Sequence, residues 1–150
     1  MTTASKDWNH QVIEEFRANG GKVGGRLIGV PLLLLTTIGA KSGQHRVVPL
    51  GYLTDGKRLI IAASKSGAPT NPDWYHNLLA NPEVTIEVGD ETYIAIATIV
   101  KGEERERLWI KASAQFRFIK DHQSKTTRQI PLITLERRTN ETGLDPILED

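Results

Sequence analysis

Two short turn signals, each set between runs of β-branched and apolar residues, constrain this chain most strongly. The first is Asp55-Gly56 and the second is Gly89-Asp90. Such dipeptides favour tight hairpins because their residues tolerate the positive φ angles that these turns require. They predict strands over residues 46–54 and 57–64 around the first turn, and over 84–88 and 92–100 around the second. The chain is therefore expected to form a largely antiparallel sheet.

Two further strands and three helices complete the expected fold. Apolar runs predict strands over residues 31–37 and 130–136, and Pro49 places its strand at an edge or a bulge. Helices are expected over residues 7–18, 72–80 and 103–115. Their supporting residues are Trp8, Val12 and Phe16 with Asp7 as cap, then Asn71 as N-cap, and then a buried stripe of Leu108, Trp109 and Ala112. Six mostly antiparallel strands with short peripheral helices indicate an α+β barrel.

The length of 150 residues suits one domain. We expect that domain to span residues 1–150, with an N-terminal helix and flexible lead at 1–26 and a tail at 137–150. The first ten residues lack the apolar core of a secretory signal. The main apolar run, residues 27–38, is broken by Gly29 and Pro31 and is shorter than the roughly 20 residues that cross a bilayer. A cytoplasmic location is therefore expected.

Composition narrows the chemistry. Cysteine is absent, which excludes a thiolate nucleophile. The four histidines lack metal-ligand spacing, so no metal site is predicted. The net charge of +1 argues against nucleic acid as a partner. Residues 22–66, however, hold seven basic residues and one acidic residue, a local charge of +6. That distribution suits a small polyanion, the alternative being solvated loop charges.

A first loop, residues 39–46, combines features of a phosphate site. Its glycines allow tight turns that present backbone N–H groups, and Ser42 adds a hydroxyl donor. Lys41 and Arg46 add positive charge, and arginine can bind phosphate with two parallel hydrogen bonds. The same pattern is also compatible with a solvated hairpin loop.

A second loop, residues 64–71, leads into the helix expected at residue 72. Lys65 and two serines stand just before that helix, and helix N-termini attract anions. Trp74 and Asn77 could then flank and hydrogen-bond a planar heterocycle. Core packing is the alternative interpretation for Trp74 and its neighbour Tyr75.

The order of these motifs resembles that of the deazaflavin-dependent nitroreductase family, the F420H2-dependent oxidoreductases related to FMN-binding split barrels. The resemblance covers residues 32–135. It rests on residues 33–37 running into G-x-K-S-G-x-x-R at 39–46, then Pro49-Leu50, residues 62–67, Asn71-Pro72-x-Trp74-Tyr75-x-Asn77-Leu78, Asn81-Pro82 and Arg128-x-Ile130-Pro131. Several spaced motifs in one order are far more specific than any single one.

The resemblance implies a split β-barrel that binds coenzyme F420. The residues it assigns to the phosphate and acidic tail are Lys41, Ser42, Gln44, Arg46 and Lys65, and those around the deazaflavin ring are Pro49, Ala63, Ser64, Trp74 and Asn77, with Gly43 and Asn71 completing the set. The implied reaction is hydride transfer from the reduced ring to a small electron-poor acceptor: a quinone, an activated enone or a nitro compound. The rivals are an FMN-dependent split-barrel reductase and a non-catalytic cofactor-binding barrel.

The resemblance also implies an acceptor site. It assigns Phe116, Ile119 and Tyr52 to the substrate, and His122 to the proton that accompanies the hydride, since histidine titrates near neutral pH. For His122 the alternative is a surface histidine without a partner. Ala40 stands where relatives often carry arginine, and residues 116–122 lack the tyrosines of the nitro-reducing member. Residues 27–31 suggest either peripheral membrane contact for a lipid quinone or a buried strand start, and the oligomeric state is left open.

Overall fold

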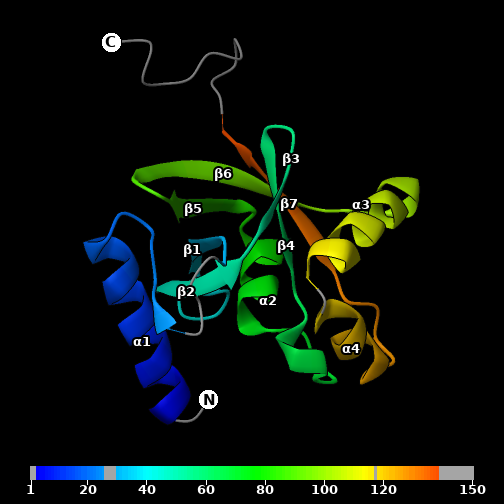
Figure 1. Ribbon diagram of the computed structural model, residues 1–150, viewed down its shortest axis with the longest axis horizontal. Coiled ribbons are helices and arrows are strands. Elements are labelled where there is room, and N and C mark those ends of the chain that lie inside the picture. The colour runs from blue at the N-terminus through cyan, green and yellow to red at the C-terminus, as the bar shows by residue number, and fades with distance from the viewer. Residues whose placement is uncertain (1–2, 26–29, 117, 139–150) are drawn as a thin grey trace.

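The sheet of this protein contains seven strands, all paired antiparallel, in a computed structural model that describes residues 3–25, 30–116 and 118–138 (Figure 1). The strands are β1 (Leu32–Ile38), β2 (His45–Gly51), β3 (Leu53–Asp55), β4 (Arg58–Ala62), β5 (Glu83–Val88), β6 (Glu91–Ile99) and β7 (Leu132–Arg137). Their order is β2-β1-β5-β6-β7-β4-β3. Both predicted hairpins are present, β3–β4 and β5–β6, which confirms the antiparallel α+β fold.

The strand predicted over residues 46–54 is divided at Tyr52. Its first part forms β2 at one edge of the sheet and its second part forms β3 at the other edge. The two edges are thus separated by a single residue along the chain, so the sheet must curl to bring them together. This curvature produces the expected split barrel. Pro49 lies in the edge strand β2, where a missing N–H is tolerated.

The helical segments described beside the sheet are α1 (Thr3–Ala18), the short 3₁₀ turn η2 (Lys65–Gly67), α2 (Asp73–Ala80), α3 (Gly102–Gln115) and α4 (Phe118–Ser124). Helix α1 begins at Thr3, so the prediction that Asp7 caps it is wrong. Val12 and Phe16 are buried as expected, but Trp8 is 42% exposed. In α3, Leu108 and Ala112 are buried and Trp109 is half-buried. Helix α4 was not predicted.

Strand β1 separates two parts of the core because its side chains alternate between faces. Leu33 and Leu35 face the barrel interior, where they pack with Leu78 of α2. Leu32 and Leu34 face outward and pack against Phe16 of α1. A third cluster lies beneath α3 and α4. Helices α1 and α2 therefore cover opposite faces of the same strand (Figure 1).

The end of α1 is attached to the β5–β6 hairpin. Arg17 donates to both carboxylate oxygens of Glu87, from Nε at 3.0 Å and from Nη2 at 2.8 Å. Gly21 has φ +93, and a Cβ there would lie 2.7 Å from Cα of Gly89. Only glycine can come this close to Gly89. The contact therefore holds the first residues after α1, which were predicted to belong to a flexible segment.

Some predictions concern segments outside the described residues. These are the tail beyond residue 138 and residues 26–29, which include most of the suggested membrane contact at 27–31. Within the described part of the chain, no helix has the length and apolar character needed to cross a membrane.

Candidate cofactor site

The loop between β1 and β2 is a closed turn with a charged tip. Gly39 N donates to the carbonyl oxygen of Gln44 at 2.7 Å, and Gly43 N donates to that of Gly39 at 2.9 Å. Gln44 N donates to Ser42 Oγ at 3.1 Å. The hydroxyl of Ser42 is thus an internal acceptor whose own proton remains available for a ligand. All four residues from Lys41 to Gln44 are exposed.

Lys41 and Arg46 are the free cations of this loop. Both are exposed, and neither has an ion-pair or hydrogen-bond partner among the described residues. Arg46 lies directly opposite Thr37 in the β1–β2 register, so the two side chains share the face of the sheet that α2 covers. Two uncompensated cations on one short loop suit an anionic ligand.

Asn77 of α2 joins this loop to the helix. Its side chain is only 8% exposed; Oδ1 accepts a hydrogen bond from Ala40 N at 3.0 Å and Nδ2 donates to Thr37 Oγ1 at 3.1 Å. Both ends of the amide are therefore occupied. The structure gives Asn77 a role in positioning the loop, and its predicted contact with a ring stays a prediction.

The loop after β4 contains unusual backbone. Lys65 has φ 45 and Ser66 has φ 55, in the left-handed region that favours glycine. Each such residue costs on the order of 1–2 kcal/mol. Ser64 is right-handed (φ −80, ψ −35), and a right-handed residue followed by a left-handed one directs successive N–H groups into an anion-binding concavity. This loop leads directly into α2, so it lies at the same helix as the loop at 39–46.

Asn71 does not cap α2, contrary to prediction. The N-cap position belongs to Pro72, and no side chain caps the helix. Asn71 Oδ1 instead accepts a hydrogen bond from Arg128 Nη1 at 2.7 Å. Arg128 also donates to backbone carbonyls of this loop, at Ala63, Ser64 and Ala68. In the sequence Arg128 stands out only as part of the late Arg128-x-Ile130-Pro131 motif, because no local signal ties it to a loop more than 50 residues earlier.

The residues predicted around the ring occupy different surroundings. Trp74 is half-buried against the interior cluster, on the same side of α2 as Asn77 three residues later. Ala63 is fully buried and Ser64 is partly exposed. Pro49 alternates with Val48, which faces the interior, so its ring lies on the α1 face of β2. Only the backbone of Pro49 could meet a ligand on the side of Arg46.

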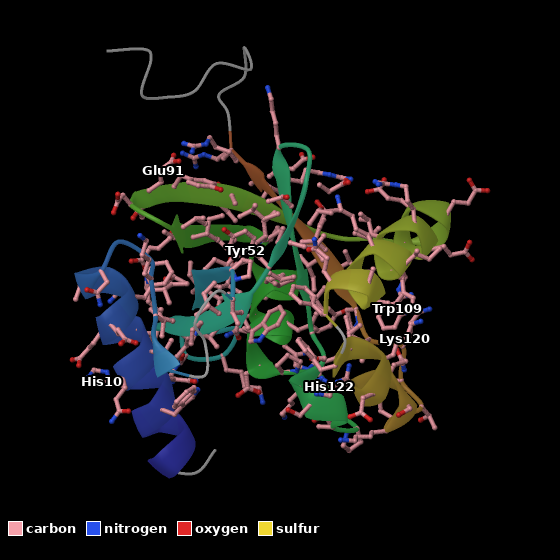
Figure 2. The ribbon with its side chains drawn as sticks, viewed as in Figure 1. His10, Tyr52, Glu91, Trp109, Lys120 and His122 are labelled. Atoms are coloured by element: carbon pink, nitrogen blue, oxygen red, sulfur yellow. The ribbon has the colours of Figure 1, made fainter. Side chains whose placement is uncertain are left out.

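His122 of α4 contacts the second loop. Its Nδ1 lies 3.2 Å from Ser64 Oγ, so the interpretation of His122 as a partnerless surface residue is wrong. Burial lowers the pKa of His122, and the charge of Lys125 lowers it further, against an opposing effect of Asp121. The ring of Phe118 lies 5.0 Å from that of His122. Figure 2 shows His122 between α4 and the turn η2 that follows β4.

The predicted acceptor residues divide into two groups. Phe116 is half-buried, and a Cβ at Gly51 would lie 3.8 Å from its Cε1, so this ring reaches the chain beside Tyr52. Tyr52 is half-buried against the interior cluster, near the centre of the view in Figure 2. Ile119 is fully buried beneath α4 and does not reach the surface.

Comparison with known proteins decides the family. Residues 8–137 match the profile of the F420H(2)-dependent quinone reductase family. A protein named as an F420H(2)-dependent quinone reductase in Mycobacterium tuberculosis strain H37Rv is 41% identical over 128 residues, which are 82% of this chain and 85% of that protein. The chain belongs to the F420H2-dependent quinone reductase family.

Two solved structures agree with this assignment. One, an F420H2-dependent reductase called FDR-A, is 40% identical with a TM-score of 0.65, over 71% of this chain and 94% of that one. The other, described as a domain-swapped dimer, is 36% identical with a TM-score of 0.68, over 88% of this chain and 99% of that one. As a member of this family the chain is an F420-dependent reductase, which decides for coenzyme F420 and against FMN.

The two loops suit coenzyme F420, the cofactor of this family. The phosphate and acidic tail of the cofactor are anionic, and the two loops offer the free cations Lys41 and Arg46 and the left-handed turn at Lys65 and Ser66. Both loops lie at α2. The loop at 39–46 is bound to it by the Ala40–Asn77 hydrogen bond, and the loop at 64–71 continues directly into it. An elongated anion could therefore contact both.

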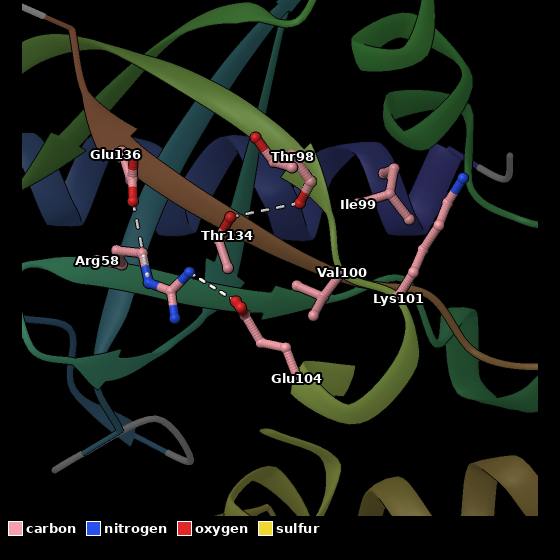
Figure 3. Close-up of a pocket in the computed structure, with 8 residues that line it drawn as sticks. All are labelled: Arg58, Thr98, Ile99, Val100, Lys101, Glu104, Thr134 and Glu136. Atoms are coloured by element: carbon pink, nitrogen blue, oxygen red, sulfur yellow. Dashed lines mark hydrogen bonds and ion pairs between the residues drawn. The ribbon is translucent and has the colours of Figure 1, made fainter. Parts of the chain in front are cut away.

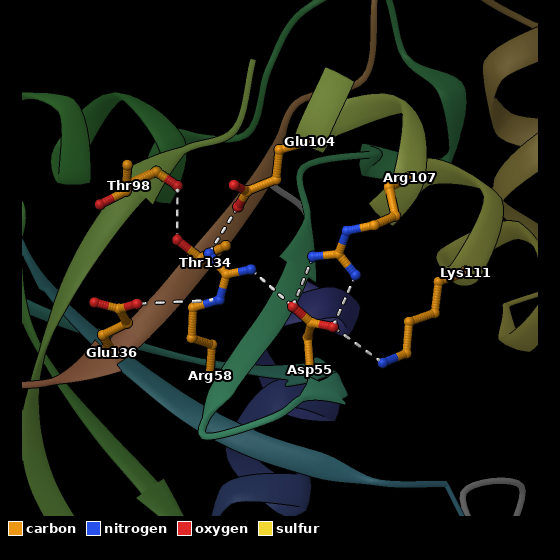
Figure 4. A network of polar contacts seen from close by, with 8 residues as sticks. All are labelled: Asp55, Arg58, Thr98, Glu104, Arg107, Lys111, Thr134 and Glu136. Carbon is orange, nitrogen blue, oxygen red and sulfur yellow. Dashed lines mark hydrogen bonds and ion pairs between the residues drawn. The ribbon is translucent and has the colours of Figure 1, made fainter. Parts of the chain in front are cut away.

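Two surface hollows lie apart from this site. One of about 310 Å³ lies where β4, β6 and β7 meet α3, and its lining residues are Arg58, Thr98, Ile99, Val100, Lys101, Glu104, Thr134 and Glu136 (Figure 3). The other, of about 460 Å³, lies between α1 and residues 23–25. None of the residues predicted to bind cofactor or acceptor lines either hollow. In the first, Arg58 is already paired with carboxylates (Figure 4).

Proposed function

We propose that this reductase uses F420H2 to reduce a quinone, with the cofactor's anionic groups at residues 39–46 and 64–71. The observation that carries the proposal is the pair of cations Lys41 and Arg46, which have no partner within the described part of the chain and lie on a loop that Asn77 attaches to α2. Family membership supplies the class of acceptor. An activated enone and a nitro compound are the other acceptors to compare.

Each loop has its own part in binding. Lys41 and Arg46 contribute charge-assisted hydrogen bonds to phosphate or carboxylate oxygens, and the N–H groups around Ser42 add neutral ones. Lys65 contributes the charge of the second loop; its Nζ lies 3.4 Å from Thr70 Oγ1, a long hydrogen bond that it can exchange for a ligand. These contacts hold the anionic end and leave the ring to lie towards Ser64 and Trp74.

The protein's part in the reaction is alignment and proton supply. The bound reduced cofactor supplies the hydride. Phe116 and Tyr52 form a half-buried aromatic wall for the acceptor, and exclusion of water there favours the transfer. His122 supplies the proton that, together with the hydride, converts a quinone to a hydroquinone. The contact with Ser64 orients its imidazole.

The test is a titration followed by an activity measurement. The protein is titrated with F420, FMN and NADPH while fluorescence is followed, and oxidation of F420H2 is then measured with a quinone, an enone and a nitro compound. We expect binding of F420 alone and turnover with the quinone. Binding without turnover on any acceptor would instead support the non-catalytic barrel.

Alanine variants test the anion site. Replacing Lys41, Arg46 or Lys65 should weaken F420 binding by about 1–3 kcal/mol each, the usual range for charge-assisted hydrogen bonds. Lys57→Ala is the matched control, because this exposed lysine lies in the β3–β4 turn at the opposite end of the strand pair. Unchanged affinity in all three variants would contradict the assignment.

Cytoplasmic location stays a prediction, as does membrane contact through residues 27–31. Flotation with lipid vesicles would test the second. Recovery of the protein with vesicles, and its loss after Leu27→Ser and Ile28→Ser are combined, would support the contact.

A further inference from the structure

Arg128 is the residue that holds the second loop in place. Among the described residues, its side chain makes four hydrogen bonds, all to residues between Ala63 and Asn71. Nη2 donates to Ser64 O at 2.7 Å, Nη1 to Ala63 O at 3.0 Å and to Asn71 Oδ1 at 2.7 Å, and Nε to Ala68 O at 2.9 Å. No carboxylate in the described part of the chain pairs with it. Its charge therefore lies against carbonyl oxygens alone.

The acceptors of Arg128 stand on both sides of the strained turn. Ala63 and Ser64 precede the left-handed residues Lys65 and Ser66, and Ala68 follows them. The turn itself contains only two short backbone hydrogen bonds, from Gly67 N to Ser64 O and from Ala68 N to Lys65 O. Arg128 thus bridges the two ends of a segment whose own conformation is unfavourable.

Arg128 is in turn held by α4. Gln123 Nε2 donates to Arg128 O at 2.7 Å, and Gln123 Oε1 accepts from Ile130 N at 2.9 Å. Gln123 is the neighbour of His122, whose Nδ1 meets the hydroxyl of Ser64. A Cβ at Gly67 would lie 2.6 Å from His122 O, so α4 also lies directly against the turn. One set of contacts therefore joins His122, Arg128 and the loop.

We propose that Arg128 is a positioning residue for the cofactor: it keeps Lys65 and Ser66 in the left-handed conformation that faces the anion and holds Ser64 against His122. This inference rests on the proposed F420 site. The planar guanidinium reaches acceptors in several directions at once, whereas a lysine ammonium donates from a single point. Retaining the charge is therefore not enough to retain the geometry.

The first test compares two conservative arginine variants. Arg128→Lys should weaken F420 binding more than about tenfold, because several charged hydrogen bonds are lost together. Arg105→Lys is the matched control: Arg105 Nη2 also donates to a carbonyl, Ile130 O at 2.6 Å, and its guanidinium lies 4.9 Å from the Trp109 ring, but it does not bond the loop. Equal affinities in the two variants would overturn the proposal.

The second test asks whether strain in the turn is the reason. Glycine adopts φ 55 without steric cost, so Ser66→Gly removes part of the backbone strain that the hydrogen bonds of Arg128 offset. Adding Ser66→Gly to Arg128→Lys should recover part of the lost F420 affinity, since Lys65 stays left-handed. Relief of this strain also stabilises the whole fold, so Tm is measured on the same variants, and a loss of affinity in Arg128→Lys without a loss of Tm excludes general destabilisation as its cause. Absence of recovery would overturn the role in holding the turn.

The third test needs no cofactor. Trypsin cleaves after Lys65 when the turn opens, and the rate of cleavage at Lys65–Ser66 can be followed by mass spectrometry. Arg128→Lys should raise this rate and Arg105→Lys should not. If Arg128→Lys fails to fold, Gln123→Ala takes its place, since it releases the Arg128 backbone without changing the sequence of the loop. If the wild type does not bind F420, the proposed function fails while the cleavage rates still decide the role of Arg128.

Discussion

The contact between His122 and Ser64 connects helix α4 with the loop after β4. Burial lowers the pKa of His122 from its ordinary value, with Lys125 as the second cause. An imidazole with a lowered pKa gives up its proton readily but is protonated in a smaller fraction at neutral pH. As a proton source it is therefore most effective below about pH 6.5.

We predict that His122→Ala slows quinone reduction by about 100-fold at the acidic end, the low end of general acid catalysis. The difference should shrink as the pH rises through the pKa of His122, since the wild type loses its protonated imidazole there. The measurement is kcat from about pH 5 to pH 8, with F420 affinity as the control. Lys125→Ala should move the wild-type profile to higher pH, because it removes a charge that lowers this pKa. Equal rates for His122→Ala and wild type at every pH would assign the proton to water.

At the scale of elements, Asp55 joins the β3–β4 hairpin to α3. Its carboxylate accepts from Arg58 in the hairpin and from Arg107 and Lys111 in the helix (Figure 4). The hydrogen bonds from Arg107, then the one from Arg58, hold the pKa of Asp55 well below its usual range. A carboxylate with a depressed pKa stabilises the folded state above its unfolded pKa of about 3.9, and this contribution is lost as the pH falls below that value.

We therefore predict that Asp55→Asn lowers the Tm by about 5 °C at pH 7, and that the gap to wild type narrows as the pH falls below about 4. Thermal unfolding at several pH values measures both effects. Glu136→Gln is the control, because Glu136 approaches Arg58 only to 4.0 Å. A gap that persists unchanged at low pH would show that packing, rather than charge, accounts for the loss.

The elements that could be predicted are those whose signals are local. Asp55-Gly56 and Gly89-Asp90 each determine a hairpin from adjacent residues. The division at Tyr52 depends on where the two edges of the sheet meet, which no local pattern contains. Asn71 has the composition of an N-cap, but Arg128, 57 residues away, takes its side-chain oxygen. Helix α4 spans seven residues, too few for a recognisable period.

At the scale of the whole molecule, the site exists because the curled sheet gathers distant segments. The charged loops could be predicted from composition and spacing, and the structure leaves Lys41 and Arg46 exposed. What composition could not supply is the arrangement: β1 carries one loop, β4 carries the other, and Arg128, from the segment before β7, fastens the second. Residues that act through other residues have no signal of their own in the sequence.

The uneven charge of the molecule leads to the last prediction. The chain carries +1 overall, but the loops at residues 39–46 and 64–71 hold Lys41, Arg46 and Lys65 and no acidic residue, so an anionic cofactor is attracted by a local field that salt screens. Between about 0.05 and 0.5 M salt the Debye length falls by roughly threefold, and F420 affinity of the wild type should fall steadily over that range. In Lys41→Ala combined with Arg46→Ala, the affinity should be lower at every salt concentration and its dependence on salt weaker. Lys57→Ala should retain the wild-type dependence, since its charge lies in the distant β3–β4 turn. The measurement is Kd by fluorescence titration across the salt series. Equal slopes for the double variant and the wild type would place the cofactor's anionic groups away from the loop at residues 39–46.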